Sequence, residues 1–261
     1  MSTSTDPDFQ LFTSLRYDPI LLQSPRNIQS WPSSPSSPSS SPFPCPFYML
    51  PHHRDRLLSA AIHFNWPKAI SVISGPTGFQ NLLDILTQNI DIRSPTPLRV
   101  RVVLDHQGTL TIESNATPPV SLSNLFPGRL PPPSSSPLPP PPQVSPLTGG
   151  LLSLSPTATL PSDPTLTLPP WPLIPDSTPT SPSPYTTFKT TTRTPYNLAR
   201  LRAHIHHLSD TREVLLSTPS RKIMEGSLTT PFFYRGGKWV TPAARSGGQL
   251  GTTRRWGLEM G

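Results

Sequence analysis

The alternation of side chains near the start of the chain predicts a β-strand. Leu11, Thr13, Leu15 and Tyr17 occupy every second position of residues 9–22, and Asp18-Pro19 then favours a turn. Residues 47–66 favour a short strand that leads into a helix from about His53. One face of that helix is apolar and is made of Leu57, Leu58, Ala61 and Ile62.

A second helix and a hairpin complete the first predicted domain. The helix covers about 77–90, where Phe79, Leu82, Leu83, Leu86 and Ile90 recur at helical spacing. In residues 98–104 apolar positions alternate with Arg99 and Arg101, a D-H-Q-G turn follows, and T-L-T-I-E pairs back as a β-hairpin. These elements predict a small α+β domain over residues 1–126.

Patterned structure resumes after residue 168. A helix from about Pro195 to Leu208 has Tyr196, Ala199 and Ala203 on one side, and R-E-V-L-L then favours a strand. The segment F-F-Y-R-G-G-K-W-V predicts a hairpin with Gly236-Gly237 in its turn, and a last helix begins at Gly251-Thr252-Thr253. A larger, β-rich domain is therefore predicted over residues 169–261.

Proline and serine limit how much of the chain can fold. Of 261 residues 40 are Pro, hydrophobic residues make up 33% and charged residues 13%. Segments so poor in apolar residues cannot offset the entropy lost on ordering. We therefore expect a disordered insertion at about 32–46 and a proline-rich linker at 127–168 that favours polyproline II. A ligand for SH3 or WW domains is the less favoured interpretation of that linker.

The net charge of +7 favours anionic partners. Because no run of five or more basic residues occurs, an anionic cofactor and a carboxylate substrate are preferred to nucleic acid. The single Cys45 excludes an internal disulfide and a cysteine metal site. The sequence H-I-H-H at 204–207 is interpreted as a solvated helix end, so no metal is expected. No secretory signal and no apolar run of about 18 residues is visible, which predicts a cytoplasmic protein without a membrane span.

Three motifs, in this order, resemble the class IV (fold-type IV) pyridoxal-phosphate enzymes. They are Y-T-T-F-K-T-T-T-R around Lys189, I-M-E-G-S-L-T-T around Glu225, and Q-L-G-T-T-R-R at 249–255. This family holds branched-chain aminotransferases, D-amino-acid aminotransferases and aminodeoxychorismate lyases. The resemblance covers about 9–126 and 170–261. It implies a two-domain fold like that of D-amino-acid aminotransferase, α+β in class, and the cofactor pyridoxal 5'-phosphate.

The resemblance also assigns roles to individual residues. Lys189 is expected to be the Schiff-base lysine and the group that moves protons. Glu225 is expected to pair with the pyridine nitrogen and keep it protonated, so that the ring acts as an electron sink. Arg56, in H-R-D-R-L, matches an arginine that grips the phosphate. Further phosphate donors are expected from the E-G-S region and from a helix N-terminus; they are Thr229, Thr230, Thr252 and Thr253.

The reaction type stays open at the level of sequence. The K-x-x-x-R form of the lysine motif favours the aminodeoxychorismate-lyase-like branch, which eliminates pyruvate from 4-amino-4-deoxychorismate to give 4-aminobenzoate for folate synthesis. The alternatives are an aminotransferase of the same fold, of the branched-chain or D-amino-acid type, and an inactive truncated homologue. Thr230 and Pro231 depart from the family pattern, and the chain stops at Gly261 about two turns into its last helix, so a truncated C-terminal domain is expected. The family also implies a homodimer and a small amino substrate that carries a carboxylate.

Overall fold

The computed structural model describes residues 8–29, 45–127, 143–144, 151–152, 171–207 and 209–260. The chain divides into two compact units. The first holds Met1–Thr117 and Phe188–Thr192, and the second holds Pro118–Thr187 and Arg193–Gly261. Residues 32–44 of the expected insertion and most of the expected linker lie outside the described residues.

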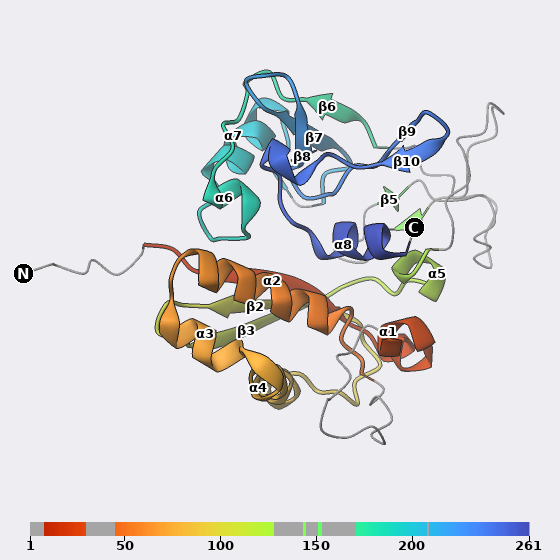
Figure 1. Cartoon of the computed structure of the whole chain (residues 1–261). Helices are drawn as coiled ribbons and strands as arrows, with labels where there is room; N and C mark the ends of the chain where they lie inside the picture. Colours follow the sequence, from red (N-terminus) through yellow and green to blue (C-terminus); the bar gives the residue numbers. More distant parts are fainter. Residues whose placement is uncertain are drawn as a thin grey trace, which may run out of the picture. The chain divides into compact units, whose positions relative to one another are not determined.

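The first unit is a three-stranded antiparallel sheet with helices packed on one face (Figure 1). Its strands are β1 (Leu11–Tyr17), β2 (Leu98–Leu104) and β3 (Leu110–Ala116), in that spatial order. The main helices are α2 (Leu50–His63), α3 (Pro67–Ile73) and α4 (Gly75–Asn89), and the short elements η1 (Pro19–Gln23) and α1 (Pro25–Gln29) precede them. The predicted first strand and hairpin are thus confirmed, with Leu11 opposite Leu104 and Leu98 opposite Ala116.

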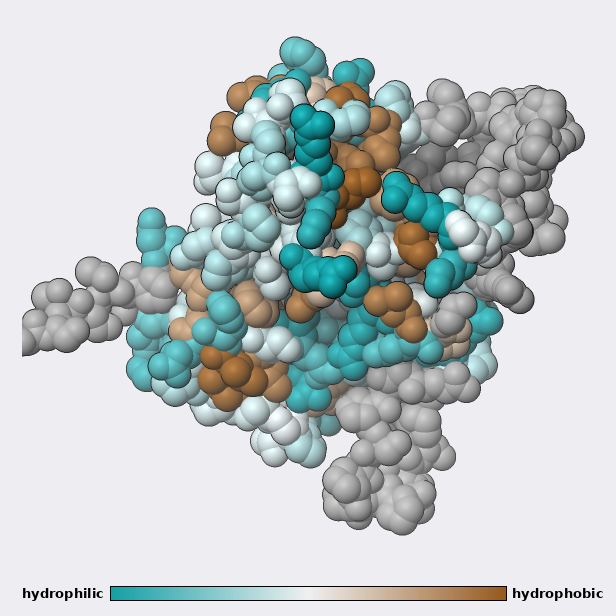
Figure 2. Space-filling model, turned by 45° about the horizontal axis from the view of Figure 1, so that its top comes forward, coloured by the Kyte–Doolittle hydropathy of each residue, from teal (hydrophilic) through white to brown (hydrophobic). Residues whose placement is uncertain are grey.

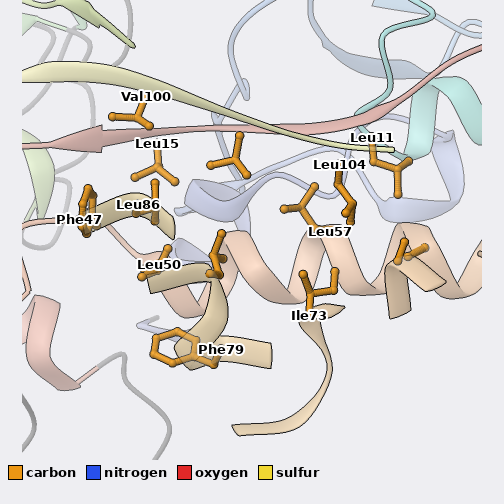
Figure 3. Close-up of a cluster of buried hydrophobic side chains, with 14 of the residues drawn as sticks. Leu11, Leu15, Phe47, Leu50, Leu57, Ile73, Phe79, Leu86, Val100 and Leu104 are labelled. Atoms are coloured by element: carbon orange, nitrogen blue, oxygen red, sulfur yellow. The ribbon is translucent and has the colours of Figure 1, made fainter. Parts of the chain in front are cut away.

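Alternate residues of this sheet fill the core of the first unit. Leu11 and Leu15 of β1 lie over α2, whose Leu50 and Leu57 face them (Figure 3). Each fully buried side chain of this size contributes roughly 1.5–3 kcal/mol relative to an exposed one. The same cluster includes Val100, Leu104, Ile73, Phe79 and Leu86.

Three details of the helices differ from the prediction. α2 begins at Leu50, before His53, because Pro51 suits the first turn, where its missing N–H is not needed. Ile62 is 58% exposed, so the buried face of α2 is narrower than the apolar pattern suggests. The short helix α3 was not predicted. It begins at Pro67 and buries Ala69 and Ile73.

The second unit is built on a three-stranded sheet of order β6-β7-β8. β6 (Leu173–Pro175) runs parallel to β7 (Glu213–Ser217), and β8 (Ile223–Gly226) runs antiparallel to it. α7 (Thr194–Arg202) buries Tyr196 and Ala199 against Val214 and Leu216 of β7. The remaining elements are α5 (Leu122–Leu125), β4 (Gln143–Val144), β5 (Leu151–Leu152), α6 (Pro184–Thr187), β9 (Phe233–Arg235), β10 (Lys238–Val240), η2 (Ala244–Ser246) and α8 (Thr252–Glu259).

Backbone conformation marks the turn of the hairpin and the end of α7. The predicted hairpin is confirmed, and Gly236 and Gly237 have φ values of 56° and 77° in the two-residue turn between β9 and β10. The predicted helix up to Leu208 ends earlier, at Arg202, because His204 adopts a left-handed φ of 53°. H-I-H-H therefore follows the helix. Among the described residues, no group of three potential ligands could hold a metal ion.

The surface mixes polar and apolar side chains. Hydrophilic residues cover much of the face seen in Figure 2, and hydrophobic ones form separate patches. The most exposed large apolar side chains include Ile62, Leu201, Leu258 and Met260. No described helix combines the length and the apolar character that crossing a membrane requires.

Candidate functional site

Lys189 lies on a short return of the chain beside β1. Leu11 and Thr190 form an antiparallel bridge, and the amide of Phe12 donates to the carbonyl of Lys189 at 3.0 Å. The amide of Thr191 donates to the carbonyl of Gln10 at 2.8 Å. These bonds explain why Phe188–Thr192 belongs to the first unit while the chain on both sides of it belongs to the second.

The side chain of Lys189 has an aromatic neighbour. Its Nζ lies 5.2 Å from the centre of the Phe12 ring, within the range of a cation–π contact. The preceding Phe188 packs against His63, with ring centres 4.5 Å apart, and against Phe64 at 5.8 Å. Phe188 thereby anchors the return on α2, and Lys189 is held from both its backbone and its neighbours.

Arg56, His53 and Thr13 form a hydrogen-bonded group in the same unit, which together with Lys189 we call the basic cluster. Nη2 of Arg56 donates to Oγ1 of Thr13 and lies 3.3 Å from Nδ1 of His53, while Thr13 Oγ1 and His53 Nδ1 are 2.7 Å apart. Nε of Arg56 is buried and has no partner. Among the described residues no carboxylate contacts Arg56.

The electrostatics of the basic cluster favour a bound anion. Desolvation lowers the pKa of Arg56 to about 10. Burial, and after it the positive charges of Arg56 and Lys189, hold the pKa of His53 well below its usual range, so this ring is neutral. A desolvated cation without a counter-ion is unfavourable. Such groups are found where a charged ligand supplies the missing partner.

Two further arginines, Arg99 and Arg101, lie on the face of the sheet that carries Phe12, opposite to the face that carries Thr13. The Arg101 guanidinium is 4.7 Å from the centre of the Phe12 ring and bonds Glu113 at 2.8 Å. Desolvation, followed by the charge of Arg101, lowers the pKa of Arg99. Ser14 is opposite Arg101 in the register, and its buried Oγ has no partner within the described part of the chain. This face thus carries positive charge and an unused hydroxyl.

Glu225, in the second unit, is a buried carboxylate at the last position but one of β8. Its Oε1 accepts a hydrogen bond of 2.5 Å from the hydroxyl of Tyr196 and one of 2.9 Å from the amide of Gln249. Burial, then the charge of Glu225, raises the pKa of Tyr196, so the phenol stays protonated as a donor. Donors to a carboxylate favour its ionised form. The Arg193 guanidinium lies 3.9 Å from the centre of the Tyr196 ring, and its Nη2 donates to the carbonyl of Ser227 at 2.8 Å.

The turn after Glu225 encloses another buried acid, Glu213 at the start of β7. Both oxygens of its carboxylate accept hydrogen bonds from the turn. Thr229 donates to Oε2 from its amide at 3.0 Å and from its hydroxyl at 2.9 Å. Thr229 is therefore already engaged by a carboxylate, although the sequence predicts it as a phosphate donor.

The other predicted phosphate donors gather at the start of α8. Thr230 Oγ1 would lie 3.2 Å from a Cβ placed on Gly251, the residue before the helix. Thr252 is buried and Thr253 exposed. No side chain caps the first turn of α8. Uncapped amides at a helix N-terminus attract anions, so Thr230 and Thr252 remain suitable for that role.

Sequence reasoning missed Glu213, Tyr196 and the Gln249 amide as partners in this region. Glu213 was placed only as part of a strand, and Tyr196 only as part of an apolar helix face. The single available signal was the string of hydroxyl residues after Glu225, which suggested an anion. In the structure, the hydroxyls of Ser227 and Thr229 in this string donate to Glu213.

No curated protein matches the chain. Among solved structures, an amino-acid aminotransferase, so named provisionally, from Mesorhizobium loti is 19% identical with a TM-score of 0.54, over 97% of this chain and 83% of the other. A provisionally named 4-amino-4-deoxychorismate lyase from Legionella pneumophila is 12% identical with a TM-score of 0.55, over 96% and 68%. A branched-chain amino acid aminotransferase from Thermobaculum terrenum, in its PLP form, is 15% identical with a TM-score of 0.52, over 96% and 63%.

At these identities the similarity shows the fold alone, and it confirms the expected α+β class and architecture. The sequence carries the stronger finding, because a model of the amino-transferase class IV family matches residues 45–261. That match spans most of the chain and includes all three motifs. The members of this family are pyridoxal-phosphate-dependent enzymes. The chain belongs to the class IV aminotransferase family.

Proposed function

We propose that this protein is a pyridoxal-phosphate-dependent lyase that splits 4-amino-4-deoxychorismate into 4-aminobenzoate and pyruvate. The observation that supports a bound cofactor phosphate is the buried Arg56, whose Nε has no hydrogen-bond partner and whose charge, together with that of Lys189, lowers the pKa of His53. The observation that favours a lyase is the K-x-x-x-R motif formed by Lys189 and Arg193.

The residues present fit the cofactor. A phosphate needs cations and amide or hydroxyl donors, which Arg56, Thr230 and Thr252 offer. An aldehyde needs an amine, which Lys189 offers. A protonated pyridine nitrogen needs a carboxylate partner, and Glu225 offers a carboxylate whose Oε1 accepts hydrogen bonds from Tyr196 and from the amide of Gln249. When bound, pyridoxal phosphate withdraws electrons from the amine-bearing carbon of the substrate.

In this proposal the protein moves protons and holds charges. Nζ of Lys189 removes the proton from the amine-bearing C4 of the substrate. The bond between C3 and the ether oxygen breaks, and Lys189 returns a proton to the methylene carbon of the departing pyruvate. No oxo acid is consumed. Arg99 and Arg101 are the candidates to bind a substrate carboxylate, because their face of the sheet is positive and partly desolvated.

The first test is chemical. Purified protein is mixed with pyridoxal phosphate, reduced with borohydride, digested and mapped by mass spectrometry. We expect the cofactor on Lys189, and Lys189→Ala should remove both the label and the absorbance of the bound cofactor. Lys222→Ala is the matched control and should keep both. A label on Lys222 or Lys238, or none at all, contradicts the assignment.

The second test separates the two reaction types. Supplied with 4-amino-4-deoxychorismate, the protein should release pyruvate without any 2-oxo acid. Turnover that requires 2-oxoglutarate would make it an aminotransferase, as several similar structures are named. A homodimer, proposed from family resemblance, is checked in the same samples by light scattering.

A further inference from the structure

We propose that Glu213 is a positioning residue for Glu225. We also propose that Glu213 occupies the donors of the Ser227–Thr229 turn, so that this turn does not bind the cofactor phosphate. Its carboxylate fills the turn in place of an external anion. The inference rests on the proposed function only where it takes Glu225 to face the cofactor. The rest concerns this unit alone.

The evidence is the number of donors that converge on one buried side chain. Glu213 is 6% exposed. Oε1 accepts three hydrogen bonds and Oε2 accepts three, all between 2.7 and 3.1 Å. The donors are the amides of Val214, Ser227, Leu228 and Thr229 and the hydroxyls of Ser227 and Thr229.

Consecutive amides that point to one place form a concave anion-binding surface. Here the amides of residues 227–229 form such a surface, and the Glu213 carboxylate occupies it with charge-assisted bonds. A second anion would have to displace a covalently attached one. Within this unit, Thr230 and Thr252 are therefore the residues that would contact the phosphate.

The same turn fixes Glu225. The amide of Gly226 donates to the carbonyl of Thr229 at 3.0 Å, and the amide of Ser227 donates to the carbonyl of Val214 at 3.0 Å. A Cβ on Gly226 would lie 2.6 Å from Thr229 Oγ1 and 3.0 Å from Glu213 Oε2, so only glycine lets the turn close this tightly. Because Glu225 directly precedes Gly226, loosening the turn frees the backbone that aims Glu225 at its donors.

A purely structural glutamate would lower stability and leave the environment of the cofactor unchanged, so the test measures both. Glu213→Gln keeps the size and replaces one acceptor oxygen by an NH₂ group that faces donors. Asp210→Asn is the matched control, because Asp210 also accepts two backbone amides, from His206 and His207, in a different turn.

The first readout needs no cofactor. Hydrogen exchange of the apo protein is followed by mass spectrometry for peptides that cover residues 226–230. In Glu213→Gln we expect exchange there to accelerate by roughly tenfold or more, since each amide loses a charged acceptor. Asp210→Asn should leave this peptide unchanged. Unchanged exchange in Glu213→Gln overturns this proposal, whether or not the protein binds pyridoxal phosphate. Failure to bind pyridoxal phosphate would refute only the proposed function.

The second readout uses pyridoxal phosphate labelled with ¹⁵N in the ring. In Glu213→Gln the nitrogen signal should move toward the unprotonated form, and in Asp210→Asn it should not. Faster exchange with an unmoved nitrogen signal would make Glu213 structural only and refute its positioning role.

Thr229→Val serves if Glu213→Gln fails to fold, because it removes one hydroxyl donor and keeps the shape. In Thr229→Val, hydrogen exchange of residues 226–230 should become faster. The affinity for pyridoxal phosphate divided by the affinity for pyridoxal, which isolates the contribution of the phosphate group, should equal that of the parent protein. Thr252→Val should lower that ratio. A ratio lowered by Thr229→Val would show that Thr229 holds the phosphate and would overturn the proposal.

Discussion

Replacing Arg56 by methionine should make the cofactor-free protein more stable while it weakens cofactor binding. The reason is that the folded protein holds this guanidinium partly desolvated, with a buried Nε that has no partner. Methionine keeps the aliphatic length, favours helix as well as arginine does, and brings no charge.

The magnitude follows from the pKa. Desolvation lowers the pKa of Arg56 from 12.5 to about 10, and at about 1.4 kcal/mol for each pKa unit this disfavours the charge by about 3 kcal/mol. The lost hydrogen bond to Thr13 offsets about 1 kcal/mol. The variant without cofactor should therefore gain about 1–2 kcal/mol in free energy of unfolding. It should lose roughly 10–100-fold in affinity for pyridoxal phosphate, the value of a hydrogen bond to a charged group.

Urea unfolding of the apo protein measures the first change, and absorbance titration with pyridoxal phosphate measures the second. Arg16→Met is the matched control in the same unit. Arg16 is fully buried but paired with Asp18 at 2.7 Å, so removing it leaves a buried carboxylate and should cost about 3–5 kcal/mol. If Arg56→Met instead destabilised the apo protein by as much as Arg16→Met, Arg56 would be a structural residue and the phosphate assignment would be wrong.

Three further predictions concern single contacts. Tyr196→Phe should cost about 1.5–3 kcal/mol of stability through the lost bond to Glu225, and a double-mutant cycle with Glu225→Gln should return a coupling of that size. Gly226→Ala should destabilise by about 1–3 kcal/mol, because its Cβ would lie 2.6 Å from an oxygen of Thr229, whereas Gly257→Ala, with its nearest atom at 3.4 Å, should stabilise α8 by about 0.5–1 kcal/mol. The free energy of unfolding should fall by up to about 1.4 kcal/mol per pH unit below about pH 6.5. The reason is that His53 binds a proton in the unfolded chain at this pH, whereas burial keeps it unprotonated in the folded protein.

Each of these has an outcome that contradicts it. Additive effects in the cycle would mean that the bond between Tyr196 and Glu225 is not made. Equal effects at the two glycines would remove the steric argument for the turn. The slope of unfolding free energy against pH should fall by the equivalent of one bound proton in His53→Gln. It should be unchanged in His207→Gln, which replaces an exposed ring. A slope that is unchanged in His53→Gln would assign it to other groups.

The sequence predicted the fold well where packing is local. The hairpin of β2 and β3 has a period of two and a D-H-Q-G turn, and the Gly236-Gly237 turn needs positive φ, so neighbouring residues decide both. The ends of helices were predicted less well. α7 stops at Arg202 because the backbone of His204 turns left-handed, and no proline or glycine announces that change.

The sequence predicted individual residues of the candidate site but not the residues that hydrogen-bond to them. The motifs name Lys189, Glu225 and Arg56 because resemblance needs only identity and order. They do not reveal that Tyr196 and Gln249 bond Glu225, since these contacts join residues distant in sequence. Nor do they reveal Glu213, whose partners lie across a strand and a turn. Those contacts depend on the register of β7 with β8, which hydrophobic patterning does not specify for so short a pair.

The placement of Lys189 shows why motif order is a poor guide to structure. In the sequence, Lys189 precedes Tyr196 and Glu225, and all of them would be assigned to the C-terminal domain. In the structure, the amide of Phe12 donates to the carbonyl of Lys189 and the amide of Thr191 donates to the carbonyl of Gln10, so that Lys189 is attached to the first unit along β1. Its amine therefore depends on β1, on Phe12 beneath it and on Phe188 against α2. Substitutions near the start of the chain should thus alter the lysine as much as substitutions beside it, and Phe12 is the position where that dependence is most direct.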